Sequence, residues 1–226
     1  DFTNEFVKIG GELLCIDEIH QYPNWSKEIK VIYDSYPKLK VVFSGSSVLE
    51  INKGNADLSR RVIPYELQGM SFREYLNFTL NKDLPTISID NLLKHDAIQL
   101  ETPLKYFQDY IAVGYYPFFT EGDYAVRLQG IISKIIDIDL VKFIGLKTHT
   151  GNKLKRLLSI IAQNVPFKPN ITKLAGLTEI SPRLLPEYFD YMEKAGLIRM
   201  LNTKGKSLRV LGKADKLYLN NTNLNF

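Results

Sequence analysis

The chain has 226 residues, 45% of them apolar and 24% charged, and a net charge of +4, which is typical of a globular protein of one or two domains. No apolar run approaches the roughly 20 residues that a membrane-spanning helix needs, and the N-terminus lacks the pattern of a secretory signal. The single cysteine, Cys15, excludes an internal disulfide and a zinc site built from cysteines. We therefore expect a cytoplasmic protein without a membrane partner.

The first 70 residues carry a pattern of alternating strands and helices. The apolar run at 13–16 predicts a strand buried on both faces, as in a parallel sheet. The apolar spacing of residues 25–36 predicts an amphipathic helix. Further strands are expected at 41–43 and 62–67. Strand, helix and strand with short links form a crossover unit of an open α/β sheet, in which ligands bind at the carboxyl ends of the strands.

From Ser71 onward the pattern becomes mostly helical. Ser71 and Glu74 have the spacing of a capping box, and the chain stays helical by pattern to about residue 150. Three further helices are predicted between 153 and 196, and residues 197–211 predict two strands around a Lys-Gly-Lys turn. Three helices followed by a hairpin predict a winged helix-turn-helix. The domain boundaries that we expect are 1–70 for the α/β part, 71–150 for a helical lid or linker region, 151–216 for the winged helix, and 217–226 for the start of a further domain.

Two adjacent carboxylates, Asp17 and Glu18, follow the first buried strand. In phosphoryl transfer one such carboxylate holds Mg²⁺ and the next orients or deprotonates the attacking water. The second strand ends near Ser46 and Ser47, whose hydroxyl groups would lie at the same edge of the sheet, close to a terminal phosphate. A short apolar run with two acidic residues also occurs in surface turns, so that alternative stays open at this point.

Two arginines, Arg60 and Arg61, lie upstream of the third predicted strand. Guanidinium groups stabilise transition-state charge in phosphoryl transfer, commonly across a subunit boundary, so the pair predicts a homo-oligomer. A solvated pair of surface charges is the alternative. His20 is more typical of a structural hydrogen-bonding residue than of a metal ligand, because no second histidine stands at a ligand spacing.

The combination LLCIDEIHQYPNW, VVFSGSS, LSRR and LQGMSFREYL resembles the AAA-type archaeal-ATPase-like family. The resemblance implies a P-loop-type parallel sheet, in which Asp17 is the Mg²⁺-side carboxylate and binds the cofactor, Glu18 the catalytic glutamate, and Ser46 or Ser47 the sensor. It implies that Arg61 is the arginine finger, although the family often has Gly-Arg where this chain has Arg60 and Arg61. VGYYPFF and KLYLNNTNL also resemble family landmarks.

An ATPase needs a phosphate-binding loop, G-x-x-x-x-G-K-[ST], and the resemblance implies that this loop precedes the strand at 13–16. The chain begins about a dozen residues before that strand. We therefore expect a fragment of a longer ATPase that binds and hydrolyses Mg-ATP. By itself the fragment is expected to hold neither ATP nor Mg²⁺ and to be inactive.

The charge of the chain is unevenly distributed. Residues 1–150 hold 16 Lys and Arg against 20 Asp and Glu, whereas residues 151–226 hold 13 against 5. A basic end binds nucleic acid or an acidic partner, or is only a soluble surface. The candidate contacts to nucleic acid are Lys153, Arg156, Arg183, Lys204, Lys206 and Arg209. The alternatives to an ATPase are therefore a winged-helix DNA-binding regulator and an interaction scaffold.

Overall fold

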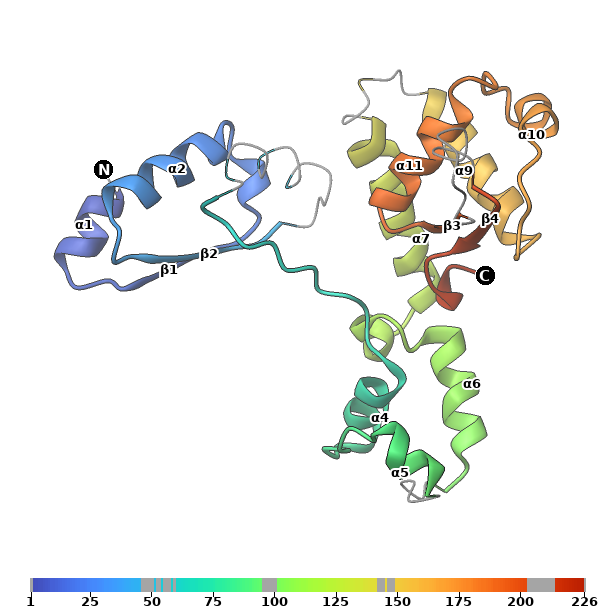
Figure 1. Ribbon diagram of the computed structural model, residues 1–226, viewed down its shortest axis with the longest axis horizontal. Coiled ribbons are helices and arrows are strands. Elements are labelled where there is room, and N and C mark those ends of the chain that lie inside the picture. Colours follow the sequence, from blue (N-terminus) through green and yellow to red (C-terminus); the bar gives the residue numbers. More distant parts are fainter. Residues whose placement is uncertain are drawn as a thin grey trace. The chain divides into compact units, whose positions relative to one another are not determined.

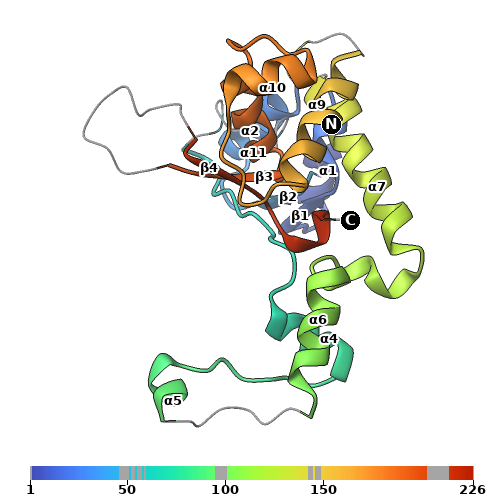
Figure 2. The ribbon, with the colours of Figure 1, turned by 90° about the vertical axis from the view of Figure 1, so that its right-hand side faces the viewer.

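The computed structural model describes residues 2–45, 51, 54, 58, 60–94, 101–141, 145, 149–202 and 214–225, and Figures 1 and 2 show its ribbon from two sides. The chain divides into two compact units. Unit 1 contains Asp1–Glu66, Ser133–Leu158 and Asn170–Gly196, and unit 2 contains Leu67–Ile132, Ser159–Pro169 and Leu197–Phe226. No helix among the described residues is both long and apolar enough to cross a membrane.

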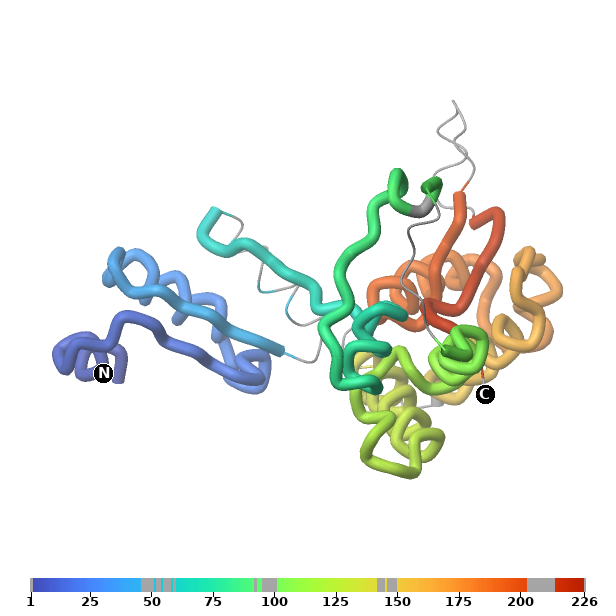
Figure 3. Tube along the Cα trace, turned by 90° about the horizontal axis from the view of Figure 1, so that it is seen from below, coloured from blue at the N-terminus to red at the C-terminus, as the bar shows by residue number. Residues whose placement is uncertain are grey.

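The N-terminal part of unit 1 confirms the predicted alternation of helices and strands. Its elements are α1 (Phe2–Lys8), β1 (Leu13–Ile16), the 3-10 turn η1 (Ile19–Gln21), α2 (Trp25–Ser35) and β2 (Lys40–Phe43). β1 and β2 are parallel, and Cys15 is opposite Val42; Figure 3 shows the two strands side by side. The crossover through α2 brings the carboxyl ends of both strands to one edge.

Only one face of this small sheet is covered. The core consists of Ile19, Trp25, Ile29 and Leu58, against which Ile16 and other half-buried side chains pack. On the opposite face Leu13 is 51% exposed and Val42 is 58% exposed, and Cys15 is also exposed. The prediction that both faces of the strands are buried is therefore wrong for the described residues, because α2 covers one face and nothing described covers the other.

The third predicted strand, at 62–67, is absent from the structure. These residues pair with no strand among those described, and the alternate side chains Ile63 and Tyr65 are 75% and 90% exposed. The alternation of apolar residues predicted a half-buried strand, but a strand forms only where a neighbouring strand supplies hydrogen bonds. No described segment supplies them here.

Unit 2 begins with the helices of the predicted helical region. They are α4 (Phe72–Leu80), α5 (Ile89–Leu93), α6 (Pro103–Val113), the 3-10 turn η2 (Pro117–Glu121) and most of α7 (Tyr124–Lys134). Both bonds of the predicted capping box are present, since the Ser71 hydroxyl accepts from the Glu74 N–H and the Glu74 carboxylate accepts from the Ser71 N–H. The rings of Phe72 and Tyr75 pack at tilted angles against Tyr110, and this aromatic packing holds α4 against α6.

α7 continues into a π-helical segment, η3 (Ile135–Leu140), which buries Ile136 and Leu140 completely. The remaining helices of unit 1 follow the predicted order. They are α9 (His149–Ala162, which ends beyond the unit boundary at Leu158), α10 (Ile171–Thr178) and α11 (Leu185–Lys194). As expected from the spacing, α11 buries its apolar face, Leu185, Tyr188, Phe189 and Met192.

Unit 2 ends with β3 (Ile198–Leu201), β4 (Lys216–Leu219) and the 3-10 turn η5 (Thr222–Leu224). The two strands are antiparallel, with Met200 opposite Leu217. Figure 2 shows β3 and β4 next to each other. A hairpin was predicted here, and β3 pairs with β4; the segment near 207–211, which was predicted as the second strand, lies outside the described residues. Because β4 pairs with β3 and Leu217 and Leu224 are buried, residues 216–225 share the core of unit 2.

Candidate active site

Asp17 and Glu18 lie at the carboxyl end of β1, beside the residue that follows β2. The backbone pairing continues past the strands, because the Ser44 N–H donates to the Ile16 carbonyl at 2.9 Å and the Ile19 N–H donates to the Ser44 carbonyl at 2.9 Å. The register of the parallel strands therefore places Ser44 opposite Asp17. The predicted edge of the sheet is real, and it carries both carboxylates.

The Asp17 carboxylate is held in a fixed orientation by two donors. Its Oδ1 accepts a short hydrogen bond from the Ser44 hydroxyl and a second one, at 3.0 Å, from the Glu18 N–H. Its Oδ2 accepts no hydrogen bond from the part of the chain that the structure describes. Asp17 is exposed, so its carboxylate is accessible to a ligand.

Glu18 follows Asp17 in a left-handed backbone conformation. Its φ of 50° and ψ of 39° lie in the left-handed region, which is costly for a residue with a side chain and often marks a functional site. The Glu18 Oε2 lies 3.5 Å from the His20 Nε2, and 42% of the Glu18 side chain is exposed. The two adjacent carboxylates thus serve different neighbours, as an ion ligand and a general base would.

His20 fills the space between the two strand ends. Only 7% of its side chain is exposed, and its Nδ1 is buried without a hydrogen-bond partner in the structure. Among the described residues, no group of three or more His, Cys, Asp and Glu side chains has the arrangement of a metal site. A structural hydrogen-bonding role for His20 therefore accounts for Nε2, which has polar neighbours. It does not account for Nδ1, which has none.

The predicted sensors, Ser46 and Ser47, lie outside the described residues. Ser44, which sequence reasoning did not select as a site residue, is the serine that the structure brings to Asp17. The signal was present in the strand boundaries. If β1 ends at Ile16 and β2 at Phe43 in parallel register, the next residues, Asp17 and Ser44, must be neighbours.

The two predicted arginines have different surroundings. The guanidinium of Arg61 forms two hydrogen bonds with Asp34, at 3.0 and 3.1 Å, and this contact lowers the pKa of the Asp34 carboxyl and raises the pKa of Arg61. Asp34 lies nine residues beyond Trp25 on α2, roughly 14 Å along the helix. Arg61 is therefore bound at the far end of α2 and is not brought to Asp17. Arg60 is exposed.

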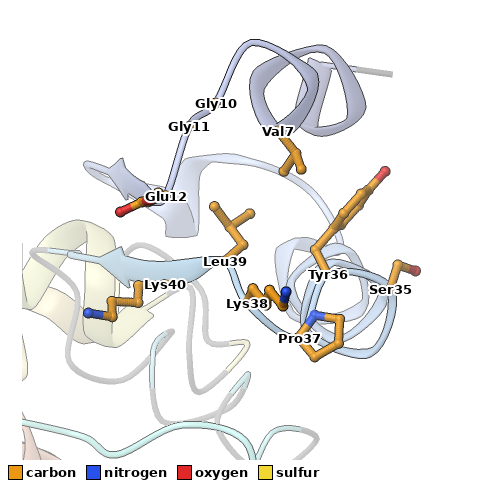
Figure 4. A pocket seen from close by; sticks show the side chains of 10 residues that line it. All are labelled: Val7, Gly10, Gly11, Glu12, Ser35, Tyr36, Pro37, Lys38, Leu39 and Lys40. Carbon is orange, nitrogen blue, oxygen red and sulfur yellow. The ribbon is translucent and has the colours of Figure 1, made fainter.

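A hollow of about 630 Å³ lies near the amino ends of the two strands. Val7, Tyr36 and Leu39 point into it, as Figure 4 shows. Glu12 and Lys40, at the starts of β1 and β2, also line it. Ligands of open α/β sheets bind at the carboxyl ends of the strands, so this hollow is at the wrong edge to extend the Asp17–Glu18 site.

The basic candidates in unit 1 are only partly available. The Lys153 Nζ donates to the Glu179 carbonyl at 2.7 Å and lies 3.8 Å from its carboxylate. Arg156 and Arg183 are exposed. The other three candidates, Lys204, Lys206 and Arg209, lie outside the described residues.

The exposed face of α11 is acidic. Glu187 and Asp190 lie on it, and Glu187 accepts a hydrogen bond from the Tyr191 hydroxyl at 2.7 Å. Carboxylates repel the phosphates of nucleic acid. This face therefore does not have the charge of a helix that enters a DNA groove.

Two family models match the chain. Residues 1–76 match an AAA domain, which is a P-loop ATPase-type domain, and residues 104–225 match a domain of unknown function, DUF8612. The first match contains the whole β1–β2 edge with Asp17 and Ser44. The second spans more than half of the chain, from α6 to η5.

Two relatives come from Methanocaldococcus jannaschii. Uncharacterized protein MJ1637 is 24% identical over 217 residues, which are 91% of this chain and 46% of the relative; uncharacterized protein MJ1544 is 27% identical over 239 residues, which are 97% of this chain and 50% of the relative. The chain thus spans about half the length of the curated relatives that it matches. No solved structure matches it. Residues 1–76 match an AAA domain. Because the match of residues 104–225 covers more than half of the sequence, the chain belongs to the DUF8612 family.

Proposed function

We propose that this chain is the part of an AAA-type ATPase that carries the metal-side carboxylate and the general base, and that the longer protein hydrolyses Mg-ATP. The observation that carries the proposal is the edge of the β1–β2 sheet. There the Ser44 hydroxyl donates to Asp17, while the adjacent Glu18 has a left-handed backbone conformation and its carboxylate lies near His20. The match of residues 1–76 to an AAA domain supports the same chemistry.

The donor set at this edge suits Mg²⁺. Carboxylate oxygens are the hard ligands that Mg²⁺ prefers, commonly one or two of them together with waters and phosphate oxygens. Asp17 would hold the ion through its exposed carboxylate, whose Oδ2 accepts no hydrogen bond from the described residues. When bound, Mg²⁺ neutralises charge on the phosphates. Ser44 and the Glu18 N–H keep the Asp17 carboxylate oriented, and Glu18 accepts the proton of the attacking water.

We propose that the phosphate-binding loop belongs to a part of the longer protein outside these 226 residues. The relatives are about twice as long as the matched region, and the exposed face with Leu13 and Val42 offers apolar area for a further element. Arg60 is the better candidate for an arginine finger in a homo-oligomer, because the Arg61 guanidinium already binds Asp34.

The test compares three carboxylate variants in the longer protein. Glu18→Gln is expected to bind ATP but to lose about 10²–10⁴-fold in turnover, the usual contribution of a positioned general base. Asp17→Asn is expected to lose Mg²⁺-dependent binding as well. Glu12→Gln is the matched control, because Glu12 precedes the same strand at its other end and is exposed; its turnover is expected to equal that of the wild type.

Turnover of Glu18→Gln at the wild-type rate would overturn the proposal. Circular dichroism of each variant separates a loss of chemistry from a loss of folding. The 226-residue chain by itself is expected to show no micromolar binding of Mg-ATP in isothermal titration, because the loop that contributes most of the phosphate affinity is missing from its sequence.

A second candidate function, nucleic-acid binding, rests on the net charge of +8 in residues 151–226 and on the exposure of Arg156 and Arg183. We propose that the exposed basic residues of this part, Arg156 and Arg183 among them, contact the phosphate backbone of nucleic acid. Such binding is expected to be weak and sequence-tolerant and to fall steeply with salt. Fluorescence titration of Arg156→Ala with Arg183→Ala at rising salt checks it, and wild-type affinity in the double variant would contradict it.

A further inference from the structure

A buried nitrogen without a partner is uncommon, because leaving a donor or acceptor unpaired inside a protein costs about 1–3 kcal/mol. His20 Nδ1 is such an atom. The imidazole lies in η1, two residues after Glu18, and nearly all of it is buried. The site chemistry proposed above uses Asp17, Glu18 and Ser44 and leaves this ring without a role.

The outer nitrogen of the ring contacts the side chain that we assign as the base. His20 Nε2 lies 3.5 Å from the Glu18 Oε2 and 3.2 Å from the Gln21 side-chain nitrogen. Because amide oxygen and nitrogen positions are assigned and not observed, Gln21 is compatible with either ring tautomer. The Glu18 carboxylate is only an acceptor when ionised, so it requires the ring proton on Nε2.

The inner nitrogen lies against the end of β2. A Cβ atom placed on Gly45 would be 3.0 Å from His20 Nδ1 and 2.7 Å from the Ile51 Cδ1. The ring therefore packs closely against the backbone at Gly45, where a side chain would meet both the imidazole and Ile51. Gly45 directly follows Ser44, which binds Asp17. One imidazole thus contacts Glu18 on one side and the segment that holds Asp17 on the other.

We infer that His20 is a positioning residue for Glu18, whose Nε2–H donates to the Glu18 carboxylate and fixes it relative to the end of β2. Its Nδ1 is then the unprotonated, accepting nitrogen. This inference rests on the proposed role of Glu18 as the general base. A carboxylate that is 42% exposed has many rotamers, and a buried ring that selects one of them preorganises the base before the reaction.

Two substitutions separate the two ring nitrogens. His20→Gln places an amide nitrogen near the position of Nε2 and keeps a donor for Glu18, whereas His20→Asn reaches only to the position of Nδ1. In the longer protein, His20→Asn and His20→Ala are expected to lower kcat about tenfold to hundredfold with KM for ATP unchanged, since misplacement of a reacting group costs this much. His20→Gln is expected to retain kcat within about threefold. Tyr22→Phe, at an exposed neighbour, is the control.

A second measurement needs no nucleotide and uses the 226-residue chain. Nitrogen-15 chemical shifts locate the ring proton of each of the three histidines, and loss of one signal set in His20→Gln assigns His20. We expect the proton on Nε2, and we expect the His20 signals to move in Glu18→Gln but not in Glu12→Gln. The inference would be overturned if the ring proton is on Nδ1, or if the His20 chemical shifts do not change in Glu18→Gln. Either result is informative even if His20→Ala fails to fold.

The outcomes also separate this inference from the proposed function. If Glu18→Gln turns over ATP like the wild type, the assignment of the base fails, whatever the His20 variants do. If Glu18→Gln is inactive while His20→Asn keeps the wild-type kcat, the base stands and the role of His20 fails. A general loss of packing would lower kcat equally in His20→Gln and His20→Asn, and that result also contradicts the inference.

Discussion

The polar cluster around Asn223 in unit 2 and the one around Asp17 in unit 1 use their hydrogen-bonding capacity differently. Asn223 is 2% exposed; its Oδ1 accepts from the Tyr115 N–H at 2.8 Å and from the Tyr124 hydroxyl at 2.6 Å. Its Nδ2 donates to the carbonyls of Tyr110 and Ile111 at the end of α6, at 3.2 and 2.6 Å. Every donor and acceptor of this amide is paired.

At the edge of the β1–β2 sheet, by contrast, Asp17 Oδ2 and His20 Nδ1 accept no hydrogen bond from the described residues. A fully paired amide such as that of Asn223 stabilises one conformation, because any change breaks bonds that nothing replaces. The spare acceptors beside Asp17 have capacity left for an ion, a water or a substrate. Spare capacity alone does not mark a functional residue in this chain, since the buried Oδ1 of Asn221 is also without a partner among the described residues.

The largest expected effect is on ATP turnover, and it comes from the adjacent arginines Arg60 and Arg61. One of them is paired and the other is not, so they test the comparison directly. Arg61 is paired with Asp34 through two hydrogen bonds, whereas Arg60 is exposed and has no partner among the described residues. In the longer protein, Arg60→Ala is expected to lower ATP turnover by about 10³-fold, the lower range for an arginine finger, with an unchanged melting temperature. Arg61→Ala and Asp34→Ala are expected to lower the melting temperature by similar, small amounts, and the double variant by no more than either.

Steady-state ATP turnover and the melting temperature are measured for all four variants, and together they show which arginine acts in turnover and which in stability. If Arg61→Ala abolishes turnover without loss of stability while Arg60→Ala retains turnover, the assignment of Arg60 as the arginine finger is wrong. Pairing with Asp34 would then be a resting contact that the active assembly releases.

Asn223→Ala gives the next largest effect and tests how much the fully paired Asn223 amide stabilises unit 2. The substitution removes four hydrogen bonds and leaves buried backbone groups unpaired, so the free energy of unfolding of unit 2 is expected to fall by about 2–4 kcal/mol. Urea unfolding followed by tyrosine fluorescence measures it. Asn225→Ala is the matched control, because Asn225 is two residues away and exposed. Equal stability of the two variants would show that the network contributes little.

The capping box of α4 gives the smallest effect, and it depends on pH. Hydrogen bonds from Ser71 lower the pKa of Glu74 below its ordinary value. The folded pKa is the lower one, so the stabilisation is fully present above the ordinary pKa of Glu and is lost as the pH falls through the lowered value. After solvent screening it amounts to less than about 1 kcal/mol. Melting of the wild type and Glu74→Gln is expected to differ at about pH 7 and to converge near about pH 3; a difference that persists in acid would contradict this origin.

Local patterns predicted the parts of the fold that depend on neighbouring residues. The helices at Trp25–Ser35 and Phe72–Leu80 follow from apolar spacing and from a capping box. The strands β1 and β2 follow from short apolar runs, and their parallel register brings Asp17 to the carboxyl edge. That much of the candidate site could be predicted from the sequence.

Contacts between distant segments could not be predicted in this way. The strand expected at 62–67 needs a neighbour that local patterning does not supply, and the pairing of β3 with β4 was not predicted from local patterns. The pairing of Arg61 with Asp34 and that of Asn223 with Tyr124 depend on three-dimensional packing over 27 and 99 residues. Such partners leave no periodic signal in a single sequence.

The uncovered face of the sheet makes the only cysteine of the chain a chemical reporter. Cys15 is exposed between Leu13 and Val42, and because the sequence contains no second thiol, a maleimide dye added to the unmodified protein reacts at this one position. Labelling is fast while the face is open and slow once another element packs over it. The rate of labelling therefore measures directly, and without any engineered residue, whether this sheet is completed when the chain is part of a longer protein.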